Sequence, residues 1–95
     1  MKVIEIALFQ LKPDITEDQV QAALRESNHW LAQQPGFVRR HHGTSEEGRL
    51  DMVEWDNLAA AKAAAEQFMT APEACALMDI IEPETVVMRH YELRS

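Results

Sequence analysis

The chain has 95 residues, 46% of them hydrophobic and 26% charged, and a formal net charge of −7. This length suits one domain with one core, so we expect residues 1–95 to form a single domain without a separate cofactor-binding half. The negative charge argues against nucleic-acid binding, and the absence of a long apolar run or a signal-peptide pattern predicts a soluble, cytoplasmic protein with no membrane role.

Residues 3–11 are predicted to form a strand that is covered on both sides. Apolar side chains occupy both faces, with Ile4, Ile6 and Leu8 on one and Val3, Ala7, Phe9 and Leu11 on the other. The lone charge is Glu5, and a carboxylate in such a strand must be paired, protonated or beside a cavity. We consider two roles for it: an ion pair with an arginine (Arg39, Arg40 or Arg89), or a place in a binding site.

A helix is predicted over residues 17–33. Thr16 and Gln19 have the spacing of a capping box at its start. The helical repeat places one stripe toward the core, and Pro35-Gly36 ends the segment because glycine is a common helix cap and proline cannot continue a helix. The stripe consists of Val20, Leu24, Ser27 and Leu31, flanked by Ala23 and Trp30.

A β-hairpin is predicted next, with strands over residues 37–42 and 50–55 and a turn over residues 45–48. Neighbouring residues of a strand point to opposite faces. His41 and His42 must therefore lie on opposite faces, and the same holds for Arg39 and Arg40. One histidine should face the helices and the other the opposite side of the sheet.

Two further helices and a last strand follow. Asp56 or Asn57 can cap a second helix that runs to Met69, and its alanines give it a slim inward face that either packs closely on the sheet or leaves room beside it. Residues 70–73 resemble another capping box at the start of a short third helix, on which Ala74, Leu77, Met78 and Ile81 share a side. Residues 85–93 form the final strand, and the single cysteine, Cys75, is expected to be a buried, small apolar residue.

This order of elements predicts an α+β protein with the ferredoxin-like βαββαβ pattern and a four-stranded antiparallel sheet. Right-handed crossovers place the helical segments on one face of the sheet. The other face would then expose the second apolar side of the first strand, which a monomer rarely tolerates. We therefore expect a homodimer that associates through the open face of the sheet.

The chain resembles the dimeric α+β barrel superfamily, most nearly the antibiotic-biosynthesis-monooxygenase-like proteins. The resemblance spans the whole chain and is carried by three features: residues 4–9 followed by Lys12-Pro13, the segment from Gln34 to Phe37, and residues 53–55 leading into an alanine-rich helix that ends in Phe68. It implies a dimeric barrel with a small pocket in each subunit. Members of this group include cofactor-independent monooxygenases of aromatic compounds, haem-degrading enzymes and proteins with no assigned reaction.

The haem-degrading type of this group differs from the present chain at two of three positions. That type uses an Asn on the first strand, a Trp at the end of the third strand and a His on the last helix. Trp55 matches the Trp, but Ala7 stands at the Asn position and residues 71–81 contain no His. We therefore do not expect haem chemistry.

Oxygenation without a cofactor requires a base, a dry pocket and an oriented ring. Histidine is the natural base near neutral pH, so His41, His42 and His90 are the catalytic candidates. Each of them can equally be structural or solvated. The candidates for substrate binding are Trp55, Trp30, Phe37, Phe68, Met78, Glu5, Arg39 and Arg40, where the arginines could hold an anionic oxygen and the aromatic residues could equally be core.

The sequence favours a cofactor-independent monooxygenase acting on a small aromatic, quinol or polyketide-like compound. A non-catalytic small-molecule-binding or stress-responsive protein is the alternative, and a cyclase or isomerase that works without oxygen is a third reading. No phosphate-binding loop, metal-ligand spacing or nucleophile motif occurs, so the sequence identifies no cofactor and no metal site.

Overall fold

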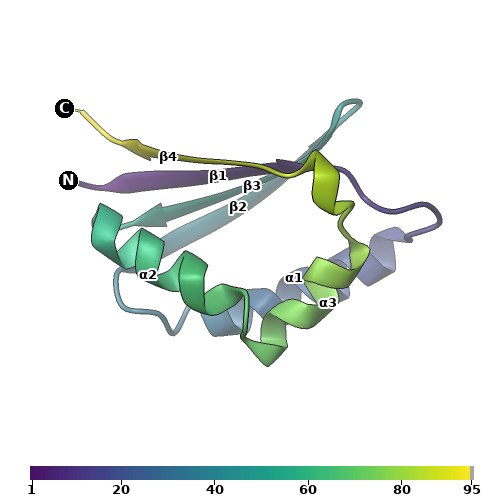
Figure 1. The fold of residues 1–95 in the computed structure, drawn as a ribbon, viewed down its shortest axis with the longest axis horizontal. Helices are drawn as coiled ribbons and strands as arrows, with labels where there is room; N and C mark the ends of the chain where they lie inside the picture. Colours follow the sequence, from purple (N-terminus) through teal and green to yellow (C-terminus); the bar gives the residue numbers. More distant parts are fainter. Residues whose placement is uncertain (95) are drawn as a thin grey trace.

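The computed structural model describes residues 1–94, whose elements follow the predicted βαββαβ order (Figure 1). The strands are β1 (Val3–Phe9), β2 (Phe37–Ser45), β3 (Gly48–Trp55) and β4 (Val87–Glu92). The helices are α1 (Glu17–Leu31), α2 (Leu58–Phe68) and the short α3 (Cys75–Ile80), with single 3₁₀ turns at Pro72–Ala74 and Pro83–Thr85. No helix among residues 1–94 has the length and apolar character that spanning a membrane requires.

The four strands form one antiparallel sheet in the order β2-β3-β1-β4. All helices lie on the same side of it, as predicted, and the other side carries no helix (Figure 1). The pairing register defines an inner face toward the helices and an open face away from them. Residues opposite one another on the open face include Ile6 with Met52 and with Arg89, and Leu8 with Leu50.

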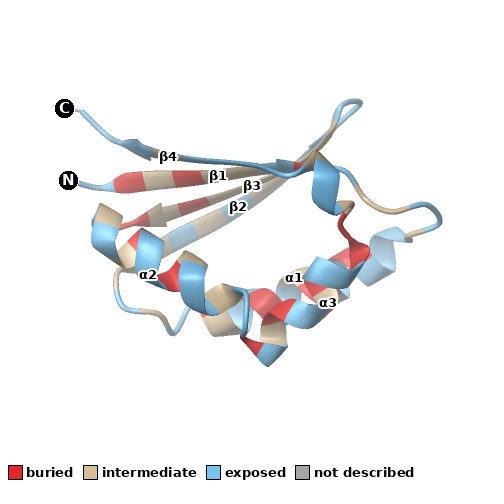
Figure 2. Cartoon of the chain, viewed as in Figure 1, coloured by how far each residue is buried: buried red, intermediate tan, exposed pale blue. Residues whose placement is uncertain are grey.

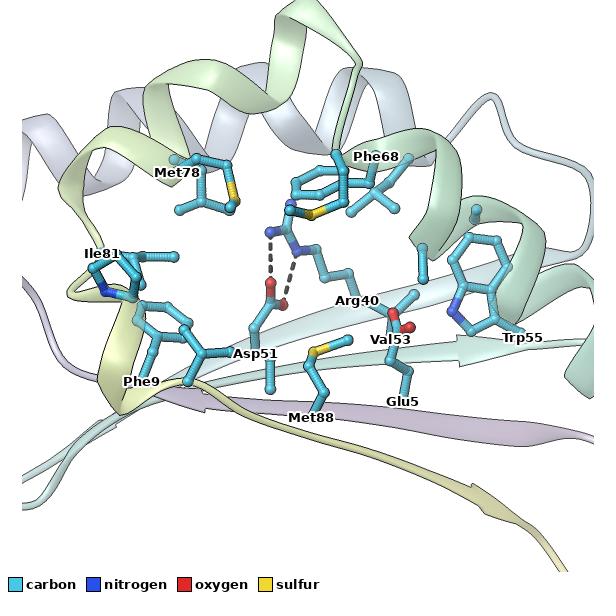
Figure 3. A pocket seen from close by; sticks show the side chains of 18 residues that line it. Glu5, Phe9, Arg40, Asp51, Val53, Trp55, Phe68, Met78, Ile81 and Met88 are labelled. Atoms are coloured by element: carbon cyan, nitrogen blue, oxygen red, sulfur yellow. Dashed lines mark hydrogen bonds and ion pairs between the residues drawn. The ribbon is translucent and has the colours of Figure 1, made fainter.

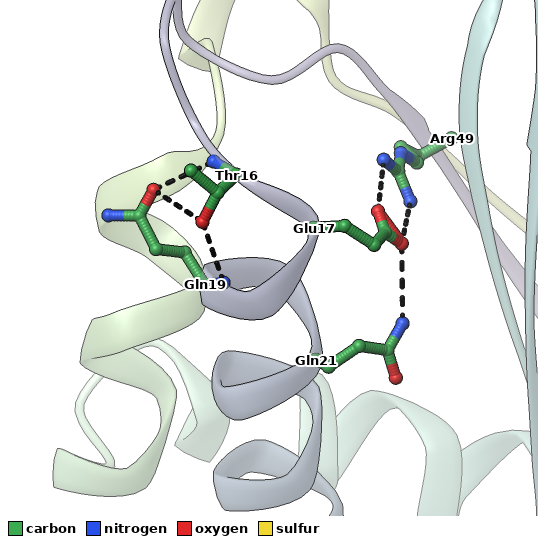
Figure 4. A network of polar contacts seen from close by, with 5 residues as sticks. All are labelled: Thr16, Glu17, Gln19, Gln21 and Arg49. Carbon is green, nitrogen blue, oxygen red and sulfur yellow. Dashed lines mark hydrogen bonds and ion pairs between the residues drawn. The ribbon is translucent and has the colours of Figure 1, made fainter.

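Local sequence signals explain the start of α1. The Thr16 hydroxyl accepts a hydrogen bond from the Gln19 backbone N–H at 3.2 Å, and the Gln19 side chain accepts one from the Thr16 N–H at 2.8 Å (Figure 4). This is the capping box that the sequence predicts. Glu17 also forms a two-pronged pair with Arg49 of β3, with Nη2–Oε2 at 2.8 Å, so the first turn of the helix is fixed to the sheet.

Helix α1 ends at Leu31, two residues earlier than expected, and Gly36 then takes a positive φ of 85°. A Cβ atom at Gly36 would lie 2.6 Å from the Cβ of Ala60. The loop therefore approaches α2 so closely that only glycine fits at position 36.

The prediction of a second capping box at residues 70–73 is wrong, because no such box forms there. The Thr70 hydroxyl donates to the carbonyl of Gln67 at 3.2 Å, and the segment that follows begins with a 3₁₀ turn that has no side-chain cap. Cys75 is exposed instead of buried, because it lies on the side of α3 opposite Leu77 and Ile80. The last strand is also shorter than predicted, since Pro83–Thr85 form a turn.

The core consists of two clusters of buried side chains that lie toward opposite ends of β1 (Figure 2). One cluster contains Val3, Leu31, Val53, Trp55, Ala61 and Ala64, and the other contains Phe9, Val20, Ala23, Leu77, Ile80 and Ile81. Phe68 packs against both. A cavity lies between them, lined by residues of both clusters.

Candidate functional site

A cavity of about 430 Å³ lies between the helices and the inner face of the sheet (Figure 3). Both core clusters contribute to its walls, which are mostly apolar and include Phe9, Val53, Trp55, Phe68, Leu77 and Ile81. The small side chains of α2 explain the space, because Ala64 and Ala65 line the cavity where larger residues would fill it. The sequence allowed the alanine-rich helix either to pack closely on the sheet or to leave room beside it, and the structure shows the second arrangement.

Among the described residues, three ionisable side chains line this cavity: Glu5, Arg40 and Asp51. All three come from the inner face of the sheet, on β1, β2 and β3. A site with apolar walls and few convergent polar groups is typical of small-molecule binding.

Glu5 is held by a histidine on the neighbouring strand. The register of β1 with β4 places Glu5 directly opposite His90, and the His90 Nε2 lies 2.7 Å from the Glu5 Oε2. Burial raises the pKa of the Glu5 carboxyl above its ordinary value, while His90 and the Trp55 N–H oppose this shift. None of the three expected arginine partners is used, since Arg39 pairs with Glu54, Arg40 pairs with Asp51, and Arg89 lies on the open face opposite Ile6.

Arg40 and Asp51 form a second, buried pair. The Nε and Nη2 of Arg40 donate to the two carboxylate oxygens of Asp51 at 2.9 and 2.7 Å. The Nη1 donates to the Ser27 hydroxyl at 2.9 Å and approaches the Leu24 carbonyl at 3.5 Å, both on α1. Only 6% of the Arg40 side chain and 12% of the Asp51 side chain are exposed, so each charge depends on the other.

The predicted histidines occupy three different environments. His41 is exposed on the open face opposite Met52, whereas His42 is on the inner face and packs against Phe9 with ring centroids 6.2 Å apart. Their placement on opposite faces is as expected. Neither lines the cavity, and His90 is connected to it only through Glu5.

His42 is a partly buried histidine whose ring nitrogens have no hydrogen-bond partner among residues 1–94. Burial lowers the pKa of His42, although Asp51 opposes the shift. This residue lies outside the cavity wall and is separated from His90 by the width of the sheet, since it stands on β2 and His90 on β4.

The predicted substrate-binding residues separate into cavity and core. Trp55, Phe68, Met78, Glu5 and Arg40 line the cavity, whereas Arg39 is exposed on the open face. Trp30 and Phe37 pack in the core, Trp30 edge-on against Phe68 at 5.6 Å and Phe37 edge-on against Trp55 at 5.9 Å. The indole N–H of Trp55 is buried and forms no hydrogen bond of normal geometry with residues 1–94, although it lies near enough to the Glu5 carboxyl to oppose the rise of its pKa.

Sequence reasoning missed Asp51 as a site residue. The signal was present, because Asp51 alternates with Val53 and Trp55 on the inward side of its strand, and Ser27 occupies an inward position of α1. Two polar residues at core positions indicate a shared polar partner. No group of three or more potential metal-ligand side chains gathers anywhere in residues 1–94.

Several solved structures share this fold. SnoaB from Streptomyces nogalater, a cofactor-independent oxygenase, matches with a TM-score of 0.78 at 20% identity, over 99% of this chain and 94% of that chain. A dimeric ferredoxin-like protein of unknown function from Jannaschia sp. CCS1 matches with a TM-score of 0.74 at 11% identity, over 98% of this chain and 100% of that chain. A hydroxynitrile lyase from Passiflora edulis matches with a TM-score of 0.68 at 15% identity, over 98% and 94%.

No model of a known protein family matches the chain, and no curated protein matches its sequence. At these levels of identity, the structural similarities establish the fold alone. They confirm the ferredoxin-like α+β fold over the length of the chain.

Proposed function

We propose that this protein is a cofactor-independent monooxygenase that acts on a small aromatic, quinol or polyketide-like compound bound in the cavity. The observation that carries this proposal is the position of Glu5, a carboxyl group with a raised pKa in a mostly apolar cavity. Such a group can take a proton from a bound ring where water is scarce. The similarity in fold to SnoaB supports O₂ as the second substrate.

In such a reaction the organic substrate supplies the electrons. After Glu5 accepts a proton, the substrate anion passes an electron to O₂, the two radicals combine, and loss of water leaves a carbonyl group. A CH₂ group and O₂ thus give C=O and H₂O. His90 holds the Glu5 carboxylate at 2.7 Å through Nε2, and the mostly apolar walls surround the anion with few polar groups.

Oxygen uptake tests this proposal. The purified protein is incubated with anthrone and with a panel of quinols and polyketide-like phenols, with a metal chelator present, in an oxygen electrode. We expect uptake above the spontaneous rate, equal to the amount of product formed and unaffected by the chelator. Compounds that bind without accelerated uptake would contradict the proposal.

A non-catalytic small-molecule-binding or stress-responsive role is the second candidate. It is favoured by the exposed apolar side chains at the cavity, because Met69, Met78 and Met88 are 64%, 38% and 44% exposed. Methionine adapts to ligands of different shape, so this wall suits a broad binder. Binding of many unrelated apolar compounds without turnover would favour it over the oxygenase.

An acid–base enzyme that works without oxygen is compatible with the same Glu5–His90 pair. The similar fold of a hydroxynitrile lyase supports this reading, since that enzyme is not an oxygenase. Turnover that is retained under anaerobic conditions would distinguish it.

We also propose that the protein is a homodimer whose subunits meet through the open face of the sheet. Ile4, Ile6, Leu50 and Met52 are only partly covered there, and Leu8 is 45% exposed. A second copy would bury this apolar surface. Several proteins of similar fold are described as dimeric, which supports this assembly.

A further inference from the structure

The guanidinium of Arg40 has little capacity left for a ligand. An arginine side chain carries five N–H donors, and the Arg40 contacts to Asp51, Ser27 and Leu24 use four of them. The sequence suggests Arg40 as a binder of an anionic oxygen, but the structure places its charge against Asp51. Arg40 could therefore donate at most one further hydrogen bond to a carboxylate ligand.

The two carboxylates in the cavity, in contrast, have acceptor capacity left. Asp51 accepts two hydrogen bonds, both from Arg40, and Glu5 has one hydrogen-bond contact of normal geometry, between Oε2 and His90, with the Trp55 N–H nearby. A carboxylate can accept about four hydrogen bonds. Both side chains can therefore accept further hydrogen bonds from a ligand that carries donors.

Glu5 and Asp51 lie one step apart diagonally on paired strands. The register pairs Glu5 with Val53 and Ala7 with Asp51. The backbone positions of diagonal neighbours of this kind are about 7–8 Å apart. Both side chains enter the cavity from the same face of the sheet, so two hydroxyl groups on one small ring system can approach them together.

The charges in the cavity also disfavour anions. Two carboxylates and one guanidinium line it, so an entering carboxylate would meet net negative or neutral surroundings. We propose that the natural ligand is a neutral aromatic compound with two hydroxyl groups, one donating to Glu5 and the other to Asp51, and that Asp51 excludes carboxylates. This inference rests on the proposed function, because it concerns the same cavity.

Binding of three inert naphthalene probes tests this inference independently of turnover. The probes are 2,7-dihydroxynaphthalene, its dimethoxy ether and 2-naphthoate, measured by calorimetry under nitrogen. We expect the dihydroxy compound to bind about tenfold tighter or more than either other probe, which is the scale of a hydrogen bond to a charged group. Equal binding of the dihydroxy and dimethoxy compounds, or tightest binding of naphthoate, would overturn the inference.

Asp51→Asn tests which residue sets the selectivity. The variant removes the negative charge that occupies Arg40, so we expect naphthoate to gain about tenfold in affinity and the dihydroxy probe to lose affinity. Asp79→Asn, at an exposed position on α3 outside the cavity, is the matched control and should leave all three affinities unchanged. An unchanged ratio of the affinities for naphthoate and the dihydroxy probe in Asp51→Asn would overturn the assignment.

Glu5→Gln gives a second test in case Asp51→Asn does not fold. It keeps the shape of the side chain but weakens the acceptor, so the preference for the dihydroxy over the dimethoxy probe should fall several-fold. A preference equal to that of the wild type would contradict the inference. If the probes behave as expected while no compound of the panel consumes O₂, the oxygenase proposal fails and the ligand class stands.

Discussion

At the scale of single residues, the cavity depends on two pairs of charged or polar side chains from different strands. Glu5 with His90 joins β1 to β4, and Arg40 with Asp51 joins β2 to β3. The first pair leaves a carboxyl oxygen available for chemistry, whereas the second neutralises two buried charges.

Glu5 should make the stability of the protein depend on pH in the acidic range. Its folded pKa is raised above the ordinary 4.5, mainly by burial, so the folded state binds this proton more tightly than the unfolded state does. Stability from this group is therefore lost as pH rises from 4.5 through the folded pKa. In thermal unfolding followed at a series of pH values, Glu5→Gln should gain stability relative to the wild type over that window. Parallel curves for the two proteins would show that Glu5 does not titrate abnormally.

Arg40→Met should be strongly destabilising, because it leaves the Asp51 carboxylate buried without its partner. Breaking a buried pair in this way costs about 3–5 kcal/mol. The double variant Arg40→Met/Asp51→Leu removes both charges and should recover most of that loss. Urea unfolding of the two variants measures the difference, and a double variant as unstable as the single one would argue against the pair as the cause.

Residue-scale prediction from the sequence found the unusual positions but not their partners. Glu5 stood out because it is the one charge in a strand that is apolar on both faces. Its partner His90 is 85 positions away in the sequence, and only the register of β1 with β4 brings the two together. Alternation assigns a residue to a face within its own strand, but it does not fix which residue of the next strand lies opposite.

At the scale of elements, some of the sequence signals for helix starts and turns predicted the observed structure correctly and one did not. The capping box at Thr16 and the hairpin turn ending at Gly48 form as predicted, because the necessary contacts are local. The similar pattern at residues 70–73 does not form a capping box, since the Thr70 hydroxyl bonds backward to the end of α2. The side chain of a residue between two helices can form a hydrogen bond either with the end of the first helix or with the start of the second.

Thr16→Ala tests the contribution of the capping box to α1. Loss of the hydroxyl leaves the Gln19 N–H without its acceptor and should reduce the free energy of unfolding by about 1 kcal/mol. Thr16→Ser keeps an acceptor in place and is the matched control. Chemical denaturation compares them, and equal losses in both variants would point to the lost methyl group of Thr16 instead.

At the scale of the whole molecule, the layout of one sheet with helices on a single side was predictable from the order of elements and the handedness of crossovers. The same layout leaves the open face to be covered, and the sequence indicated this through the two apolar faces of β1. The cavity was less predictable. Its size depends on how far the alanine-rich α2 stands from the sheet, which the spacing of alanines alone does not decide.

Ile6→Lys tests the homodimer. Ile6 lies on the open face between Met52 and Arg89, so a lysine would place a charge within the apolar interface. If Ile6 is a hot spot near the centre of an interface of about 800 Å² per partner, its loss costs about 2 kcal/mol or more, which raises the dissociation constant roughly thirtyfold. Sedimentation at several concentrations measures it, with Ala63→Lys on the exposed side of α2 as control. A wild-type chain that is monomeric at micromolar concentration would contradict the dimer.

In the proposed reaction, the cavity brings O₂ and an aromatic substrate together over Glu5. The most direct measurement is mass spectrometry of the product formed from anthrone, or from the best quinol of the panel, under isotope-labelled O₂. We expect one labelled oxygen atom per product molecule with the wild type, and a rate lower by about 10²–10⁴-fold with Glu5→Gln, the range for loss of a general base. An unlabelled product, or label incorporated equally fast by Glu5→Gln, would contradict the account.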